Sequence, residues 1–360
     1  MKTSIQIGKI MGIPIKLHIT FLLILPVFAL VFASSPAPYG FVEVESTIVR
    51  YAFGTLAAVA LFACVLLHEL GHSYVAMKYG TKIRSITLLL FGGVASMEEV
   101  PRDPKIELKM AMSGPGVSFA LGVAFLLIYL LLKPIWAESP VTQLVFVLGL
   151  LNVILCGFNL IPAFPMDGGR ILRAYLARQM PYMEATRKAV YIGKTFAFAM
   201  GVFGFLILSP ILILIAFFVY IGASEEEKTT EITVTLEGVK VRDIMTKNVI
   251  SVPPTMTVSE LAELMFMEKH MGYPVVDGRL RGVVTFSDVR QVPIEQRGKT
   301  LVGDVMTKKI ISVAPDDDAI NALKMMSQRN IGRVLVMEDG AMVGIVSRTD
   351  LIRSIQLLRE

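Results

Sequence analysis

Cysteine and charge are both scarce in this chain of 360 residues. The two cysteines, Cys64 and Cys156, each lie in an apolar run, so no framework of disulfide bonds is expected. Charged residues make up only 18% of the sequence, whereas hydrophobic residues make up 54% and the mean hydropathy is +0.63. This composition excludes an ordinary soluble globular protein and indicates several membrane spans.

The C-terminal part has no excess of basic charge. The net charge is +5, but the excess of Lys and Arg lies in residues 1–223, whereas residues 224–360 are close to neutral. Because nucleic-acid binding requires a basic surface, no nucleic-acid partner is expected. The basic N-terminal segment is followed by an apolar run without a convincing small-residue cleavage site, so no cleavable signal peptide is expected.

Apolar segments recur through the first 223 residues. We predict six membrane spans, at residues 17–33, 48–77, 111–133, 141–160, 189–208 and 210–223. The last two are short and are separated by Ser209–Pro210, which predicts a tight helical hairpin. Lys and Arg gather on alternate flanks of these spans, and the opposite flanks keep only Arg50 and Lys133. The sequence therefore predicts a multi-pass protein of the cell membrane, in contact with the lipid bilayer and with a cytoplasmic N-terminus.

One further apolar segment, residues 83–103, is interrupted by Gly92–Gly93. We expect strands or a re-entrant loop here, because irregular backbone at membrane depth is tolerated only beside protein or water. The expected fold is a polytopic α-helical membrane protein with a short membrane-associated β region.

The C-terminal part contains an internal repeat. "VRDIMTKNVISVPPT" (241–255) and "VGDVMTKKIISVAPD" (302–316) agree at nine of fifteen positions. A period of this length predicts two copies of one small domain. Each copy should form a strand, an amphipathic helix, two strands and the start of a helix, which is a small α/β module. We predict a membrane domain (1–223), a charged linker with one strand-like piece (224–240), and two cytoplasmic repeats (241–296 and 297–360).

The second predicted span contains ionisable residues in "CVLLHELGHSYVAMKYG", residues 64–80. His68 and His72 are four residues apart, so on a helix they lie on one face, where two neutral imidazoles can hold zinc. Glu69 lies beside them and can take a proton from a water that the metal activates. Ionisable groups in lipid are costly, so this group is expected to be functional.

A catalytic zinc site requires a third protein ligand and one open position. Asp167 in "NLIPAFPMDGGR" (159–170) is the leading candidate, because prolines and a Gly-Gly pair fix an irregular backbone beside an apolar helix. The alternative is an Asp that only caps a helix. His18 is expected to be an interfacial side chain, and Cys64 a buried structural cysteine.

HELGH in an apolar helix, with N-x-x-P-x-x-P-M-D-G-G further on, resembles the site-2 protease family over about residues 1–223. Members of this family are intramembrane zinc metalloproteases that cut transmembrane helices of other proteins. The resemblance implies one zinc ion per chain, held by His68, His72 and Asp167, with Glu69 as the general base. It also implies that Asn159 stabilises the oxyanion or holds the unwound substrate.

The same resemblance implies further features of the membrane domain. The substrate would be a transmembrane protein, and the region of Gly92–Gly93 would accept its unravelled segment as an added edge strand. "SGPGVSF" (113–119) is similar to a small-residue segment of the family's third span, where helices pack closely.

The paired repeats resemble a tandem of CBS domains, which commonly bind adenine nucleotides between the copies. The family's G-h-x-[ST]-x-x-D ending stands here as Gly282, Thr285 and Asp288, and again as Gly344, Ser347 and Asp350. The resemblance implies that Asp binds ribose hydroxyls and that Thr or Ser faces phosphate. Arg348 adds a positive charge in the second copy alone, which predicts one nucleotide site rather than two. The alternative is a dimerisation module without a ligand, and a homodimer through the pair is possible in either case.

Two other functions compete with a regulated protease. A transporter or channel can carry a CBS pair, and so can a membrane receptor for nucleotides that has lost its catalytic activity. A metal transporter does not require a general base such as Glu69 beside its ligands. An inactive receptor is expected to have lost one of the three ligands, and His68, His72 and Asp167 are all present.

Overall fold

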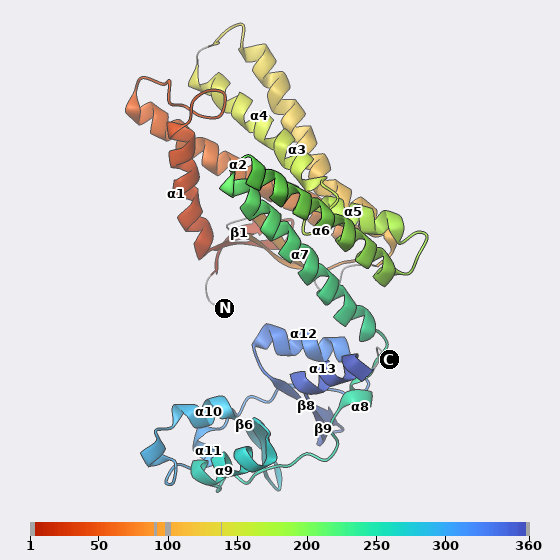
Figure 1. The fold of residues 1–360 in the computed structure, drawn as a ribbon. Helices are drawn as coiled ribbons and strands as arrows, with labels where there is room; N and C mark the ends of the chain where they lie inside the picture. Colours follow the sequence, from red (N-terminus) through yellow and green to blue (C-terminus); the bar gives the residue numbers. More distant parts are fainter. Residues whose placement is uncertain (1–3, 90–91, 98–101, 138, 358–360) are drawn as a thin grey trace. The chain divides into compact units, whose positions relative to one another are not determined.

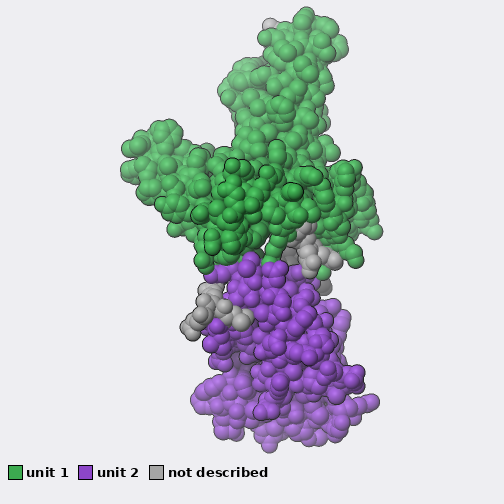
Figure 2. Space-filling model, turned by 90° about the vertical axis from the view of Figure 1, so that its right-hand side faces the viewer, with its two compact units in different colours: residues 1–230 green, residues 231–360 purple. Residues whose placement is uncertain are grey.

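The computed structural model describes residues 4–89, 92–97, 102–137 and 139–357. The chain divides into two compact units, residues 1–230 and residues 231–360 (Figure 2). Buried apolar side chains form separate clusters within each of them.

The first unit consists mainly of long apolar helices (Figure 1). Its helices are α1 (Ile19–Ser34), α2 (Thr47–Lys78), α3 (Pro104–Leu132), α4 (Pro140–Asn159), α5 (Asp167–Leu176), α6 (Tyr182–Leu206) and most of α7 (Pro210–Thr235). Among the described residues α2, α3, α4 and α6 are long and apolar enough to cross a membrane. The other two predicted spans fall on α1, which has 16 residues, and on α7, which becomes charged after residue 224. A polytopic helical fold is therefore confirmed, while the count of six spans stays a prediction.

A four-stranded sheet accompanies these helices in the order β1 (Ser4–Ile10), β2 (Ile13–His18), β3 (Ile83–Leu89) and β4 (Gly92–Met97). The central pair β2–β3 is parallel and the two outer pairs are antiparallel. The strands expected within residues 83–103 are present as β3 and β4, and residues 90–91 and 98–101 of that segment lie outside the described residues. Among the described residues β4 is an edge strand, with β3 as its one neighbour in the sheet.

The N-terminal hairpin was not predicted, although its signal is visible in the sequence. Ile5 and Ile7 alternate with polar residues, and Met11–Gly12 form a two-residue turn in which both residues have positive φ (54° and 79°). Two such residues are typical of the tight turns that connect antiparallel strands.

The sheet packs against the helix that carries the two histidines. Ile13 and Ile15 of β2 and Ile86 of β3 form a buried cluster with Leu70 of α2. Since Leu70 lies between His68 and His72 in sequence, the sheet holds one face of this turn while the histidines use another.

The segment between α4 and α5 is also firmly packed. Ala163 and Phe164 are fully buried and contact residues of α6 and α7, including Ala197, Val219 and Ala223. This packing fixes the position at which α5 begins, and its first residue is Asp167.

The second unit has two small sheets flanked by helices (Figure 1). The first copy contains α8 (Val241–Ile244), α9 (Val258–Glu268), β5 (Gly272–Asp277), β6 (Arg279–Thr285), α10 (Phe286–Gln291) and the short 3-10 helix η1 (Ile294–Gln296). The second contains α11 (Val302–Val305), β7 (Ser312–Val313), α12 (Ala319–Arg329), β8 (Arg333–Glu338), β9 (Ala341–Ser347) and α13 (Arg348–Leu357). The predicted order of elements is confirmed, except that the first strand of the first copy is reduced to a single bridge between Val252 and Val275.

The two copies exchange their opening turns. Val241, from the start of the first copy, packs in the core of the second copy, and Val302 packs in the core of the first. Bridges join Thr246 to Ile345 and Val283 to Thr307 in the same crossed manner. Neither copy therefore completes its core without the other.

The predicted strand-like piece in the linker 224–240 is wrong. Helix α7 continues to Thr235, and Ile232 and Leu236 pack against the core of the second copy. Ile232 and Leu236 are four residues apart, and this spacing fits one face of a helical turn. The alternation of apolar residues with threonine over the same segment also fits a strand, so the sequence pattern allows both.

Candidate metal centre

Three predicted ligands converge from two helices in the first unit. His68 and His72 lie on α2, and Asp167 opens α5; the three residues are 4%, 6% and 8% exposed. Nε2 of His68 is 3.2 Å from Nε2 of His72, and Oδ2 of Asp167 is 3.3 and 3.1 Å from these two atoms. Among the described residues this is the group of His, Cys, Asp and Glu side chains that is arranged to hold a metal ion.

These distances fit a zinc ion. Atoms that bind zinc at about 2.0–2.1 Å in a tetrahedral arrangement lie about 3.3 Å from one another. The triangle formed by the two nitrogens and the oxygen has sides of 3.1–3.3 Å, so it forms one face of such a tetrahedron. A zinc ion held by these three atoms would keep a fourth position for water or substrate, as a catalytic site requires.

The far side of each imidazole is held by α3. Nδ1 of His72 lies 2.7 Å from the Met110 carbonyl oxygen, and Nδ1 of His68 lies 2.9 Å from Oγ of Ser118. Because a carbonyl only accepts, Nδ1 of His72 carries the proton and Nε2 of the neutral ring presents its lone pair. In the same tautomer Nδ1 of His68 would donate to Oγ of Ser118. Two lone pairs and a carboxylate then face one another, and a cation between them relieves their repulsion.

Gly114 makes room for the ligands. It lies on the same face of α3 as Met110 and Ser118, at spacings of four residues. A Cβ atom at Gly114 would lie 2.6 Å from Nε2 of His68 and closer still to Nε2 of His72. The small-residue segment 113–119 therefore leaves space for the two imidazoles at Gly114, and it also lets α3 pack closely on α2.

Glu69, the predicted general base, is half-buried beside β4. A Cβ atom at Gly93 would overlap Cγ of Glu69 and lie 3.0 Å from its Cδ. The carboxyl-bearing side chain thus runs against the backbone of a sheet edge, next to the converged ligands.

The other candidate catalytic and metal-binding residues, Asn159, His18 and Cys64, are not among the converged ligands. Asn159 ends α4 and donates from Nδ2 to the Leu155 carbonyl at 3.0 Å, so its catalytic role stays a prediction. His18 caps α1, where its Nδ1 accepts from the Thr20 amide at 3.3 Å. Cys64 is buried one turn before His68, and it is not part of the converged ligand group within the described residues.

A buried charge network near the metal centre was not predicted. Arg173 of α5 is 4% exposed and donates to Glu107 of α3 from Nε at 2.8 Å and from Nη2 at 2.5 Å. Its Nη1 donates to Glu226 of α7 at 2.6 Å, and the guanidinium lies 4.9 Å from the centre of the Phe164 ring. Arg173 therefore ties the helix that begins with Asp167 to α3 and α7.

The second unit contains a small cavity at the second predicted nucleotide motif. Ser347 and Asp350 line it, together with His270, Tyr273 and Arg333, which the sequence reasoning missed. Asp350 accepts from the amide and hydroxyl of Ser347 at 2.8 and 2.7 Å, and Asp288 accepts from Thr285 in the same way at 2.7 Å.

The predicted phosphate partner in this motif, Arg348, points elsewhere. Its Nη2 donates to the Met326 carbonyl at 3.3 Å, whereas the cation that lines the cavity is Arg333. Burial lowers the pKa of the Arg333 guanidinium, because partial removal from water disfavours the charged form. A bound anion would offset this desolvation.

The folds and the metal centre together define a multi-pass membrane metalloprotease with a paired α/β domain. Family models agree: peptidase family M50 matches residues 56–138 and 133–202, and the CBS domain matches residues 241–295 and 302–357. The chain belongs to the M50 (site-2 protease) family of zinc metalloproteases and carries tandem CBS domains. This assignment favours the protease over the transporter and the inactive receptor.

Individual relatives extend over the whole chain. The zinc metalloprotease MJ0392 of Methanocaldococcus jannaschii is 41% identical over 359 residues, which cover 99% of this chain and 98% of that protein. Rip3 of Mycobacterium tuberculosis is 32% identical and covers 100% of this chain and 94% of its own length. A solved site-2 protease from Methanocaldococcus jannaschii is 45% identical, with a TM-score of 0.45, and covers 62% of this chain and 95% of that one.

The close approach of Gly114 to the ligands leads to a prediction. In Gly114→Ala the added methyl group must displace the imidazoles, so zinc affinity should fall roughly 10–100-fold. Gly116→Ala is the matched control on the same helix, since a Cβ there meets nothing within 4 Å. Metal analysis of purified protein after dialysis against graded chelator should show loss from Gly114→Ala only. Equal retention in both variants would contradict the assigned site.

Proposed function

We propose that this zinc metalloprotease is an intramembrane endopeptidase that cleaves transmembrane segments of other proteins. The observation that carries the proposal is the position of His68 and His72 on α2, an apolar helix long enough to cross a membrane, with Asp167 and Glu69 beside them. A protease of soluble substrates has no reason to bury this group within a helix that is able to cross a membrane.

The depth of the site suits hydrolysis. His72 and His68 precede Lys78, the end of α2, by six and ten residues, or about 9 and 15 Å along the helix axis. The site then lies inside the apolar layer but near one face, where water can enter. The distribution of Lys and Arg favours the cytoplasmic face, and a cytoplasmic N-terminus and CBS pair are part of the same proposal.

The chain's own residues supply orientation and proton transfer. Bound zinc supplies Lewis acidity, which activates water at neutral pH and polarises a carbonyl. Met110 and Ser118 hold the imidazoles in the metal-binding tautomer, and Glu69 accepts the proton of the attacking water. Glu69 lies against β4 at Gly93, and β4 is an edge strand among the described residues, so an unwound substrate segment can add along it beside Glu69. Asn159 is proposed to stabilise the oxyanion or to hold that segment.

Replacing Glu69 tests the hydrolytic mechanism. Glu69→Gln should keep zinc but lose at least about 10²–10⁴-fold in rate, because an amide does not accept the proton of the attacking water. Glu184→Gln, an exposed position at the start of α6, controls for the same chemical change. The assay is mass spectrometry of products from labelled transmembrane peptides co-reconstituted with the full chain in vesicles.

Two outcomes of that assay would count against the proposal. Undiminished cleavage by Glu69→Gln would refute the role of Glu69. Cleavage of soluble extended peptides alone, with apolar transmembrane peptides left intact, would refute the intramembrane substrate.

We further propose that an adenine nucleotide binds the CBS pair and regulates proteolysis. The cavity at Ser347 and Asp350 measures about 90 Å³, well below the usual size of a ligand pocket. Binding of a whole nucleotide therefore requires the surrounding segments to part, which couples binding to a change of shape. The half-buried cation Arg333 offers a partner for phosphate, and Asp350 an acceptor for ribose hydroxyls.

Helix α7 provides a physical route from this domain to the metal centre. Its last turn packs in the CBS core through Ile232, while Glu226, two turns earlier, binds Arg173 of α5. Because α5 begins with Asp167, a shift of α7 would act on the helix that supplies the third ligand.

A homodimer through the CBS pair is also proposed, since Phe266 and Met267 on α9 are 76% and 69% exposed.

The two matched motifs allow a controlled test of nucleotide binding. Asp350→Ala should weaken binding of AMP, ADP or ATP roughly 10–100-fold, because it removes a charged acceptor. Asp288→Ala removes an equivalent helix-capping interaction but does not line the cavity, so it should have a smaller effect. Calorimetry on the full chain measures binding, and the vesicle assay measures cleavage. Equal losses in both variants, or no binding below millimolar concentration, would refute the nucleotide site.

A further inference from the structure

Arg173 lies close to the chain on both sides of Asp167. It follows Asp167 by six residues on α5, and its guanidinium lies 4.9 Å from the ring centre of Phe164, three residues before Asp167. Phe164 is 1% exposed and Arg173 is 4% exposed. One buried side chain therefore brackets the short stretch of backbone that carries the third ligand.

The partner of Arg173 on α3 lies next to the part of that helix that orients the histidines. Glu107 accepts from Nε and Nη2 of Arg173 at 2.8 and 2.5 Å. Glu107 lies one turn before Met110, whose carbonyl oxygen is 2.7 Å from Nδ1 of His72. The Glu107–Arg173 pair thus joins the helix that holds an imidazole to the helix that begins with Asp167.

This ion pair is costly to bury. Glu107 is 2% exposed, and its Oε2 has no hydrogen-bond partner among the residues that the structure describes. Replacing a buried ion pair by apolar side chains of similar volume often leaves the free energy of unfolding unchanged or raises it. A guanidinium that donates twice to one carboxylate fixes direction as well as distance, which apolar packing does less sharply. The pair therefore suits a role in geometry better than a role in stability.

We propose that Glu107 and Arg173 are positioning residues for the metal centre. The pair sets the separation between α3 and α5, and so holds the Asp167 carboxylate at 3.1–3.3 Å from the nitrogens of the two histidines. The inference rests on the assignment of Asp167 as a zinc ligand. Without the pair, Asp167 is the ligand that loosens, because the two histidines are four residues apart on one helix and stay together.

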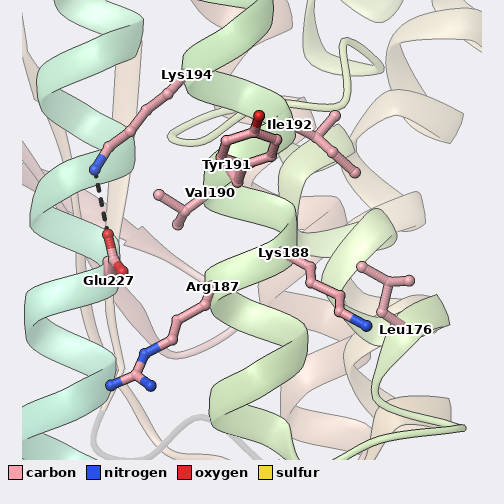
Figure 3. A pocket seen from close by; sticks show the side chains of 8 residues that line it. All are labelled: Leu176, Arg187, Lys188, Val190, Tyr191, Ile192, Lys194 and Glu227. Atoms are coloured by element: carbon pink, nitrogen blue, oxygen red, sulfur yellow. Dashed lines mark hydrogen bonds and ion pairs between the residues drawn. The ribbon is translucent and has the colours of Figure 1, made fainter.

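The test replaces both members of the pair with unbranched apolar side chains. The double variant Glu107→Met with Arg173→Met leaves neither partner as an unpaired buried charge, so it should fold. Glu226, the second carboxylate beside Arg173, has a side chain that is 29% exposed and reaches water. The matched control is Lys194→Met with Glu227→Met, which removes an ion pair of 3.2 Å between α6 and α7 (Figure 3).

Two measurements on the full chain in detergent separate geometry from stability. Competition with graded chelator should show that zinc affinity falls roughly 10-fold in the Glu107/Arg173 double variant, falls further in Asp167→Ala, and is kept in the control. The visible spectrum of the cobalt-substituted double variant should shift toward that of Asp167→Ala, since its bands depend on the number and kind of ligands. Thermal unfolding of the metal-free chain should change little.

Three outcomes would overturn the proposal. The first is a zinc affinity and a cobalt spectrum that are unchanged in the Glu107/Arg173 double variant. The second is a lower unfolding temperature with an unchanged spectrum, which would make the pair purely structural. The third is an equal loss of affinity in the control variant. Unchanged affinity and spectrum in Asp167→Ala would instead refute the ligand assignment on which the proposal rests.

Discussion

The structure depends on the convergence of two side chains of the apolar helix α2 with the first side chain of α5. Two imidazole nitrogens and a carboxylate oxygen lie 3.1–3.3 Å apart, and all three side chains are at least nine-tenths buried. Without a cation this arrangement is repulsive and poorly solvated, whereas around zinc it is the expected coordination geometry. Much of the first unit supports it: α3 orients the rings and leaves space at Gly114, and the sheet packs on Leu70.

The third ligand requires separate support, because it comes from a different helix. Asp167 is placed by the buried Ala163–Phe164 segment before it and by Arg173 after it. Arg173 lies between carboxylates of α3 and α7, and a buried cation with two such partners resists displacement. Helix α7 carries Glu226, which binds Arg173, and Ile232, which packs against the core of the second CBS copy.

Local patterns predicted much of this molecule, and long-range contacts account for what they missed. The spacing of His68 and His72, the rigid turn before Asp167 and the repeated motif are all visible in short stretches of sequence. The Arg173 network joins residues 66 and 53 positions apart, and nothing near Arg173 in sequence indicates them. The exchange of opening turns between the CBS copies is equally non-local. The prediction of a strand in the linker was wrong for another reason. The order Ile-Thr-Val-Thr-Leu suits a strand, but α7 continues to Thr235 and its residue Ile232 packs against the CBS core, as does Leu236 just after the helix.

The metal coordination itself is the most direct test of this account. X-ray absorption at the zinc edge of the purified full chain should show two imidazole nitrogens and carboxylate or water oxygens at about 2.0–2.1 Å. His72→Ala should lose one imidazole contribution. Sulfur scattering at about 2.3 Å would place Cys64, one turn before His68, among the ligands and would contradict the assignment of Asp167. An unchanged spectrum in His72→Ala would contradict the site as a whole.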